Sequence, residues 1–203
     1  MSKSTVKKLL QSMTKEEVIE VMLELYSARK EAQEYLDFYA EPDEKSKLEE
    51  YKAIICEEFY PKNDRRTPKV RFSVCRKAVS DFKKLQPSAE AIAELLVSYM
   101  EWATHFTCDY GDMWEQYYDS VAKNFGKTLK HLLANDLWEQ YEKRLQRCME
   151  WSSRNGYGFA DAIKKLYYEG CAMNHDLLTK FPMARSNAAE LKKLFNGSIF
   201  KYY

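Results

Sequence analysis

Apolar side chains recur along most of this chain at intervals of three and four residues, the spacing of amphipathic helices. The clearest stripe consists of Val18, Met22, Leu25, Ala28, Ala32, Leu36 and Tyr39. No segment alternates with period two for long enough to predict a strand. We therefore expect an all-α protein of eight or nine helices in antiparallel hairpins. The predicted helices span residues 3–12, 15–39, 43–60, 72–85, 88–108, 113–134, 137–153, 159–180 and 188–196.

Capping residues mark several of the predicted helix starts. The chain has only 6 glycines and 5 prolines in 203 residues, so turns are few and helices are long. A capping residue precedes a Glu by three positions in the pairs Thr14–Glu17, Asp112–Glu115, Asp136–Glu139 and Asn187–Glu190. The two side chains of such a pair can satisfy two backbone N–H groups at a helix N-terminus.

Residues 61–68 lack a helical pattern and contain two prolines. We expect a single helical domain over residues 1–203, in which residues 61–68 form an irregular connector and residues 171–203 a C-terminal extension. The connector either separates an N-terminal helical unit from the rest or forms a long loop inside one domain.

A short pattern occurs twice, roughly 49 residues apart. The Met-Glu-Trp of residues 100–102 and the Tyr-Gly of residues 110–111 have counterparts at residues 149–151 and 157–158. Both copies predict a helix, a Gly-containing turn and a second helix. The pattern indicates a short stacked array of helical hairpins, although such arrays usually need at least three units.

The overall net charge of +1 conceals a strongly basic segment. Residues 62–84 have a net charge of +7, whereas residues 1–61 have −5 and residues 85–203 have −1. A cationic helix face preceded by a cationic loop can neutralise several phosphates. The predicted anion-binding residues are Arg65, Arg66, Lys69, Arg76, Lys77, Lys83 and Lys84. The alternative is a solvated face balanced by acidic neighbours, such as the Glu-rich helix after Pro42.

Arg71 differs from the other cations of this segment because a helix that included it would point it toward the apolar face. A charge in that position has to be paired. Either Ser73 caps the helix and leaves Arg71 in the loop, or Arg71 meets a buried carboxylate and has a structural role.

The last ten residues contain several apolar and aromatic side chains, which should not remain in contact with water. We expect this segment to dock on the body of the protein or to bind a partner. The candidate partner-binding residues are Phe195, Ile199, Phe200, Tyr202 and Tyr203. The other aromatic residues are expected to fill space between helices, with their hydroxyl groups at the rim.

Five cysteines lie far apart in the sequence without a Cys-x-x-Cys spacing. The chain also starts without an apolar signal region and contains no apolar stretch of membrane-spanning length. We therefore expect free thiols in a cytoplasmic protein with no membrane partner. His105 with Cys108, and Cys171 with His175, can each share a helix face. The short spacing of a zinc site is missing, so no metal and no cofactor are predicted.

Four segments carry a resemblance to other proteins: residues 7–20, 71–85, 109–112 (Asp-Tyr-Gly-Asp) and 156–159 (Gly-Tyr-Gly-Phe). Together they resemble a bacterial family that is known only as a domain of unknown function. The resemblance covers about residues 3–170. It implies a bacterial, intracellular, helical protein and supplies no catalytic residue.

Three functional hypotheses follow. The leading one is a non-catalytic helical module that binds another protein. The second is a nucleic-acid or polyanion binder that uses residues 62–84. The third is an enzyme of unrecognised type, which we do not expect because the sequence contains no phosphate loop, dinucleotide motif, nucleophile elbow or metalloprotease motif.

Overall fold

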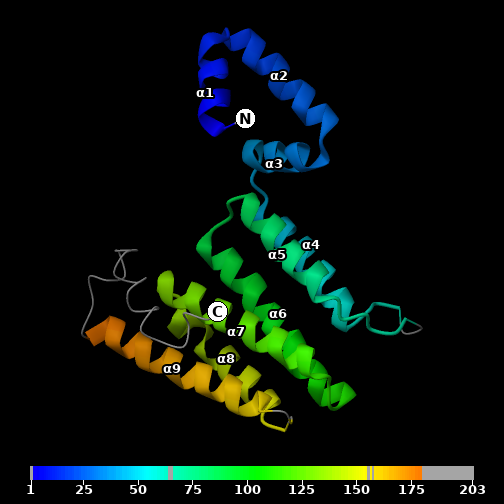
Figure 1. Cartoon of the computed structure of the whole chain (residues 1–203), viewed down its shortest axis with the longest axis vertical. Coiled ribbons are helices and arrows are strands. Elements are labelled where there is room, and N and C mark those ends of the chain that lie inside the picture. Colours follow the sequence, from blue (N-terminus) through cyan, green and yellow to red (C-terminus); the bar gives the residue numbers. More distant parts are fainter. Residues whose placement is uncertain (1, 64–65, 155, 157, 180–203) are drawn as a thin grey trace. The chain divides into compact units, whose positions relative to one another are not determined.

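The structure is a computed structural model that describes residues 2–63, 66–154, 156 and 158–179 (Figure 1). The described residues form nine α-helices and no strand, which confirms the all-α prediction. No helix in this part of the chain has the length and apolarity needed to cross a membrane. The helices are α1 (Lys3–Ser12), α2 (Lys15–Ala28), α3 (Lys30–Ala40), α4 (Glu44–Phe59), α5 (Phe72–Lys84), α6 (Ala89–Tyr110), α7 (Glu115–Ala134), α8 (Trp138–Ser152) and α9 (Phe159–Thr179).

The single helix predicted over residues 15–39 was wrong, because the chain breaks at Arg29 into α2 and α3. Arg29 has an extended backbone (φ −137°, ψ 116°). The break lets α3 fold back and pack on α2, where the Tyr26 hydroxyl donates a hydrogen bond to the Asp37 carboxylate at 2.8 Å. The apolar periodicity continues through the break, and no Gly or Pro marks it, so the break could not be predicted from the sequence.

One predicted capping pair is confirmed and two are wrong. Thr14 and Glu17 form a reciprocal capping box at the start of α2. Helix α7 instead starts after Trp114 and α8 after Leu137, both without a side-chain cap. Asp112 accepts a hydrogen bond from Tyr118, and Asp136 has a left-handed backbone with φ 58°, so neither is the capping residue. The pair Asn187–Glu190 and the helix predicted at 188–196 lie outside the described residues.

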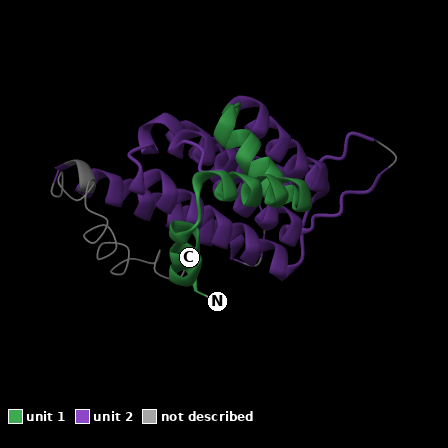
Figure 2. Ribbon diagram, turned by 90° about the horizontal axis from the view of Figure 1, so that it is seen from above, with its two compact units in different colours: residues 1–44 green, residues 45–203 purple. Residues whose placement is uncertain are grey.

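The chain divides into two compact units, residues 1–44 and residues 45–203 (Figure 2). The boundary precedes the connector at 61–68, which lies within the second unit. In that unit α6–α7 and α8–α9 form two helical hairpins, and α6 packs on α8 while α7 packs on α9. The hairpin turns contain Gly111 (φ 82°) and Gly158 (φ 71°), a left-handed backbone that favours glycine. The two copies of the sequence pattern therefore correspond to two stacked hairpins.

Aromatic side chains form much of the core of the second unit. Trp138, Tyr99, Tyr117, Phe59 and Phe125 are among its fully buried side chains. The hydroxyl of Tyr117 donates to the backbone carbonyl of Ala103 at 2.6 Å, and the Asn124 amide donates to the hydroxyl of Tyr99 at 3.1 Å. These rings fill space between helices, but the hydroxyl groups of Tyr99 and Tyr117 form their hydrogen bonds inside the core rather than at the rim.

Gly170 of α9 allows close packing on α8. A Cβ atom at this position would lie 2.5 Å from a ring carbon of Trp138, and that ring is almost completely buried.

We predict that Gly170→Ala lowers the free energy of unfolding by about 2 kcal/mol, because overpacking outweighs the higher helix propensity of Ala. Urea titration monitored by circular dichroism measures the change. Gly156→Ala is the matched control, since a Cβ atom there meets nothing within 4 Å. Equal unfolding midpoints for the two variants would contradict the packing argument.

Candidate functional site

The predicted anion-binding residues occupy the loop before α5 and the outer face of that helix. Lys77 and Lys84 both form ion pairs with Asp81, the latter at 2.6 Å. Arg66 lies 3.6 Å from Glu57 of α4. Arg65 lies outside the described residues. Three of the seven predicted cations thus form ion pairs within the chain, and they share two carboxylates.

The other three candidates, Lys69, Arg76 and Lys83, form no ion pair with a described residue. Burial and the positive charge of Lys127 of α7 both lower the pKa of Lys83. Burial and Lys127 likewise lower the pKa of Lys130, one turn further along α7. We call Lys83, Lys127 and Lys130 the α5–α7 lysine surface. Lys127 and Lys130 could not be recognised from the sequence as part of this surface, because they lie more than 40 residues from the basic segment.

Arg71 binds a buried carboxylate, which is one of the two alternatives that the sequence left open. Its guanidinium Nε and its backbone N–H donate to Glu58 Oε2 at 3.0 and 2.9 Å. The carbonyl of Glu58 accepts from the Val70 N–H at 2.9 Å. Arg71 is also the residue before the first turn of α5, and Ser73 provides no cap. Glu58 therefore joins the end of α4 to the start of α5, and Arg71 is structural.

Arg144 of α8 is held between two acidic residues of α6. Its Nε donates to Glu101 at 2.9 Å, and its guanidinium also pairs with Glu94. Lys52 of α4 lies 3.2 Å from Glu94. Burial alone would lower the pKa of Arg144, but its bonds to Glu101 and Glu94 outweigh burial and raise that pKa. These charges satisfy one another and hold helices together.

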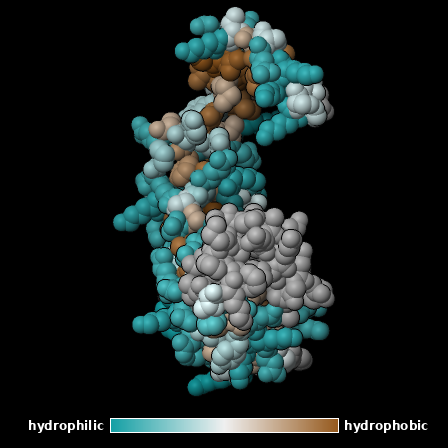
Figure 3. Space-filling model, turned by 90° about the vertical axis from the view of Figure 1, so that its left-hand side faces the viewer, coloured by the Kyte–Doolittle hydropathy of each residue, from teal (hydrophilic) through white to brown (hydrophobic). Residues whose placement is uncertain are grey.

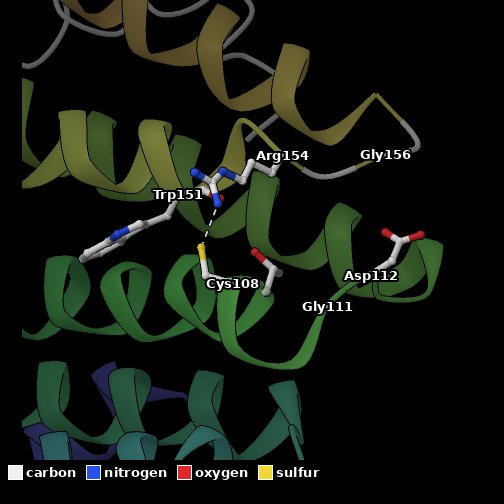
Figure 4. A pocket seen from close by; sticks show the side chains of 7 residues that line it. Cys108, Gly111, Asp112, Trp151, Arg154 and Gly156 are labelled. Atoms are coloured by element: carbon white, nitrogen blue, oxygen red, sulfur yellow. Dashed lines mark hydrogen bonds between the residues drawn. The ribbon is translucent and has the colours of Figure 1, made fainter.

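A pocket of about 430 Å³ lies where the turns of the two stacked hairpins meet (Figure 4). Its lining residues are Thr107, Cys108, Gly111, Asp112, Trp151, Arg154 and Gly156. The thiol of Cys108 donates to the carbonyl of Trp151 at 3.5 Å, and burial together with Asp109 raises its pKa. Both effects disfavour the thiolate, which is the nucleophilic form of cysteine.

His105, one of the considered metal ligands, belongs to a hydrogen-bonded group with Tyr60 and Asp109. The Tyr60 hydroxyl lies 3.1 Å from His105 Nδ1 and 2.8 Å from Asp109. Across the described residues, no three His, Cys, Asp or Glu side chains come together to hold a metal ion. All five cysteines are free thiols, as predicted.

The largest departure from the sequence analysis is an exposed apolar surface on α1 and α2, where hydrophobic residues gather in Figure 3. Neither helix contains a buried residue, and the side chains of Leu9 and Leu23 are each 60% exposed. We define the α1–α2 apolar face as Val6, Leu9, Ile19, Val21, Met22, Leu23 and Leu25. Met22, Leu25 and Tyr39 of the predicted core stripe are therefore exposed, because two short helices leave part of each apolar stripe uncovered.

The predicted partner-binding residues Phe195, Ile199, Phe200, Tyr202 and Tyr203 lie outside the described residues. Their role remains a prediction.

Comparison with known proteins identifies a family. A family model described as "Family of unknown function (DUF6155)" matches residues 1–167. No curated protein and no solved structure matches the chain. The matched range includes the α1–α2 apolar face, the basic segment and the pocket, and it excludes the aromatic C-terminal residues.

The Glu58–Arg71 contact leads to a pH-dependent prediction. Burial by itself raises the pKa of Glu58, but hydrogen bonds and charge from Arg71 outweigh it, so this pKa lies below its usual value of 4.5. A carboxylate with a lowered native pKa stabilises the fold above its unfolded pKa, and that stabilisation is lost as the pH falls through the native pKa.

We therefore expect Glu58→Gln to lower the free energy of unfolding at pH 7 by about 2 kcal/mol. The difference from wild type should shrink as the pH falls below about 4.5. Urea titrations across this pH range measure both effects. Glu57→Gln, which changes the neighbouring and more exposed carboxylate, should have a small effect. A pH-independent loss in Glu58→Gln would contradict the role of its charge.

Proposed function

The chain belongs to DUF6155, a family of unknown function, and from that premise we propose that it is a non-catalytic helical module that binds another protein through the α1–α2 apolar face. The observation that carries this proposal is the exposure of seven apolar side chains on two helices that bury none of their residues. Contiguous apolar surfaces of this kind mark interaction sites. Burial of one such side chain contributes about 2 kcal/mol.

The character of the face favours a protein partner over a membrane. Helices that lie on anionic membranes carry Lys and Arg on their polar face. Helix α1 carries three lysines, but the polar face of α2 carries Glu16, Glu17, Glu20 and Glu24, which an anionic membrane repels. An amphipathic helix of a partner fits this surface better, because its apolar residues meet the apolar face while its polar residues stay in water.

The state of the ionisable groups supports a non-catalytic role. Glu58, Glu94 and Glu101 are each bound to an arginine, and the pKa of the Cys108 thiol is raised. General acid–base catalysis requires groups that can exchange protons near the operating pH. These groups serve the fold.

A photo-crosslinking experiment tests the proposal. With p-benzoylphenylalanine in place of Leu23 in the full chain, irradiation of cells that naturally make the protein should give a discrete adduct of higher mass, because the partner covers this residue. The same group in place of the exposed Glu139 of α8 is the control and should give none. The absence of any adduct of higher mass from position 23 would overturn the proposal.

A second candidate function is polyanion binding by the α5–α7 lysine surface. In its favour, Lys83 forms no ion pair with a described residue, and the positive charge of Lys127 lowers its pKa. Two lysines that repel each other are stabilised by an anion that neutralises both charges.

For this candidate we predict that the full chain binds heparin and that Lys83→Ala with Lys127→Ala lowers the salt concentration needed for elution. Lys77→Ala with Lys84→Ala removes the same charge from lysines that Asp81 already balances, and should have a smaller effect. Elution of both double variants at the wild-type salt concentration would refute polyanion binding at this surface.

A further inference from the structure

We propose that the partner of the α1–α2 apolar face is a second copy of this chain. In this dimer, α1 of each copy packs against α2 of the other about a two-fold axis. The inference rests on the proposed function and names the partner of the same surface. Three features of α1 and α2 support it: their opposite charges, the absence of ion pairs on those charges, and the shape of their apolar stripes.

The two helices carry equal and opposite charges. Helix α1 contains Lys3, Lys7 and Lys8 and no acidic residue, so its net charge is +3. Helix α2 contains Lys15 and four Glu, so its net charge is −3. A two-fold axis makes the same patch serve both copies, so a surface with one basic and one acidic helix is complementary to itself. An unrelated partner would need both an acidic surface opposite α1 and a basic surface opposite α2.

These charges have no partner within the described part of the chain. Lys7 and Lys8 form no ion pair with any described residue, and neither do Glu20 and Glu24. Helix α2 packs on α3, whereas α1 makes no comparable contact with α2. The charges of Lys7, Lys8, Glu20 and Glu24 are therefore available to a second copy, whereas Glu17 is held in the capping box with Thr14.

The apolar stripes of the two helices also match. On α1 the apolar residues Val6, Leu9 and Leu10 form one narrow stripe, with Lys3 and Lys7 beside it. On α2 the apolar residues between Val18 and Leu25 span more than half of the circumference at 100° per residue. Helix α3 packs on only part of that arc, so room remains on α2 for one further helix. With 10 and 14 residues, α1 and α2 are about 15 and 21 Å long and can pair along most of their length.

A charge-exchange experiment tests the dimer. Variant A carries Lys7→Glu and Lys8→Glu, and variant B carries Glu20→Lys and Glu24→Lys. In a dimer of A alone, or of B alone, like charges oppose each other at both contacts. In a mixture of A and B, opposite charges meet at both contacts again. Circular dichroism of each variant checks that its helix content is unchanged.

Light scattering after size exclusion, at low salt and at several concentrations, measures the mass. The wild-type chain should reach twice its 24.0 kDa mass. The dimer of each variant alone should be weaker than the wild-type dimer by about tenfold or more. The equimolar mixture of the two variants should recover the wild-type mass. Leu9→Glu, which places a charge in the centre of the apolar stripe of α1, should give a monomer that no mixing restores.

Three results would overturn the proposal: a wild-type chain that stays monomeric at every concentration, variants that dimerise as wild type does, or a mixture that fails to recover. These results are separate from failure of the proposed function. A cross-link from position 23 to a different protein would overturn only the second copy as partner. A missing cross-link would overturn both.

Discussion

Helix α6 has to be covered on almost every side, and the second unit is organised around that requirement. Twelve of its residues are buried, and α5, α7 and α8 pack against it. Its two partly buried carboxylates, Glu94 and Glu101, lie two turns apart on one side. Arg144 of α8 meets both. The apolar residues of α6 thus require several neighbouring helices to cover them. The two carboxylates determine where α8 lies on α6.

The same need to balance buried charge shapes the basic segment. Glu58 at the end of α4 has only 4% of its surface exposed, and it binds Arg71 through both side chain and backbone. This contact connects the two sides of the loop between α4 and α5 and removes Arg71 from any external anion site. Asp81 has a similar effect on Lys77 and Lys84. A segment with a net charge of +7 therefore presents a smaller cationic surface than its composition suggests.

Unit 1 contrasts with this arrangement because its helices have amphipathic sequences and little to cover them. The spacing of Val18, Met22 and Leu25 is that of a core-facing stripe, yet Met22 and Leu25 are exposed. In the second unit, stripes of the same kind on α6 and α8 are buried against each other. The difference lies in the number of neighbouring helices. This contrast is what favours an interaction role for unit 1.

The sequence by itself determined the helical class, most helix boundaries and the two hairpins around Gly111 and Gly158, because these depend on local periodicity and backbone freedom. It also led to the two possible roles of Arg71. Only the tertiary structure decided between those roles. It also showed the break between α2 and α3 at Arg29, the effect of Lys127 on Lys83, and the exposure of the α1–α2 apolar face. Each of these outcomes depends on which residues distant in sequence become neighbours in space. A stripe has the same spacing whether or not another helix covers it, and a charge has the same sign whether or not a carboxylate lies beside it.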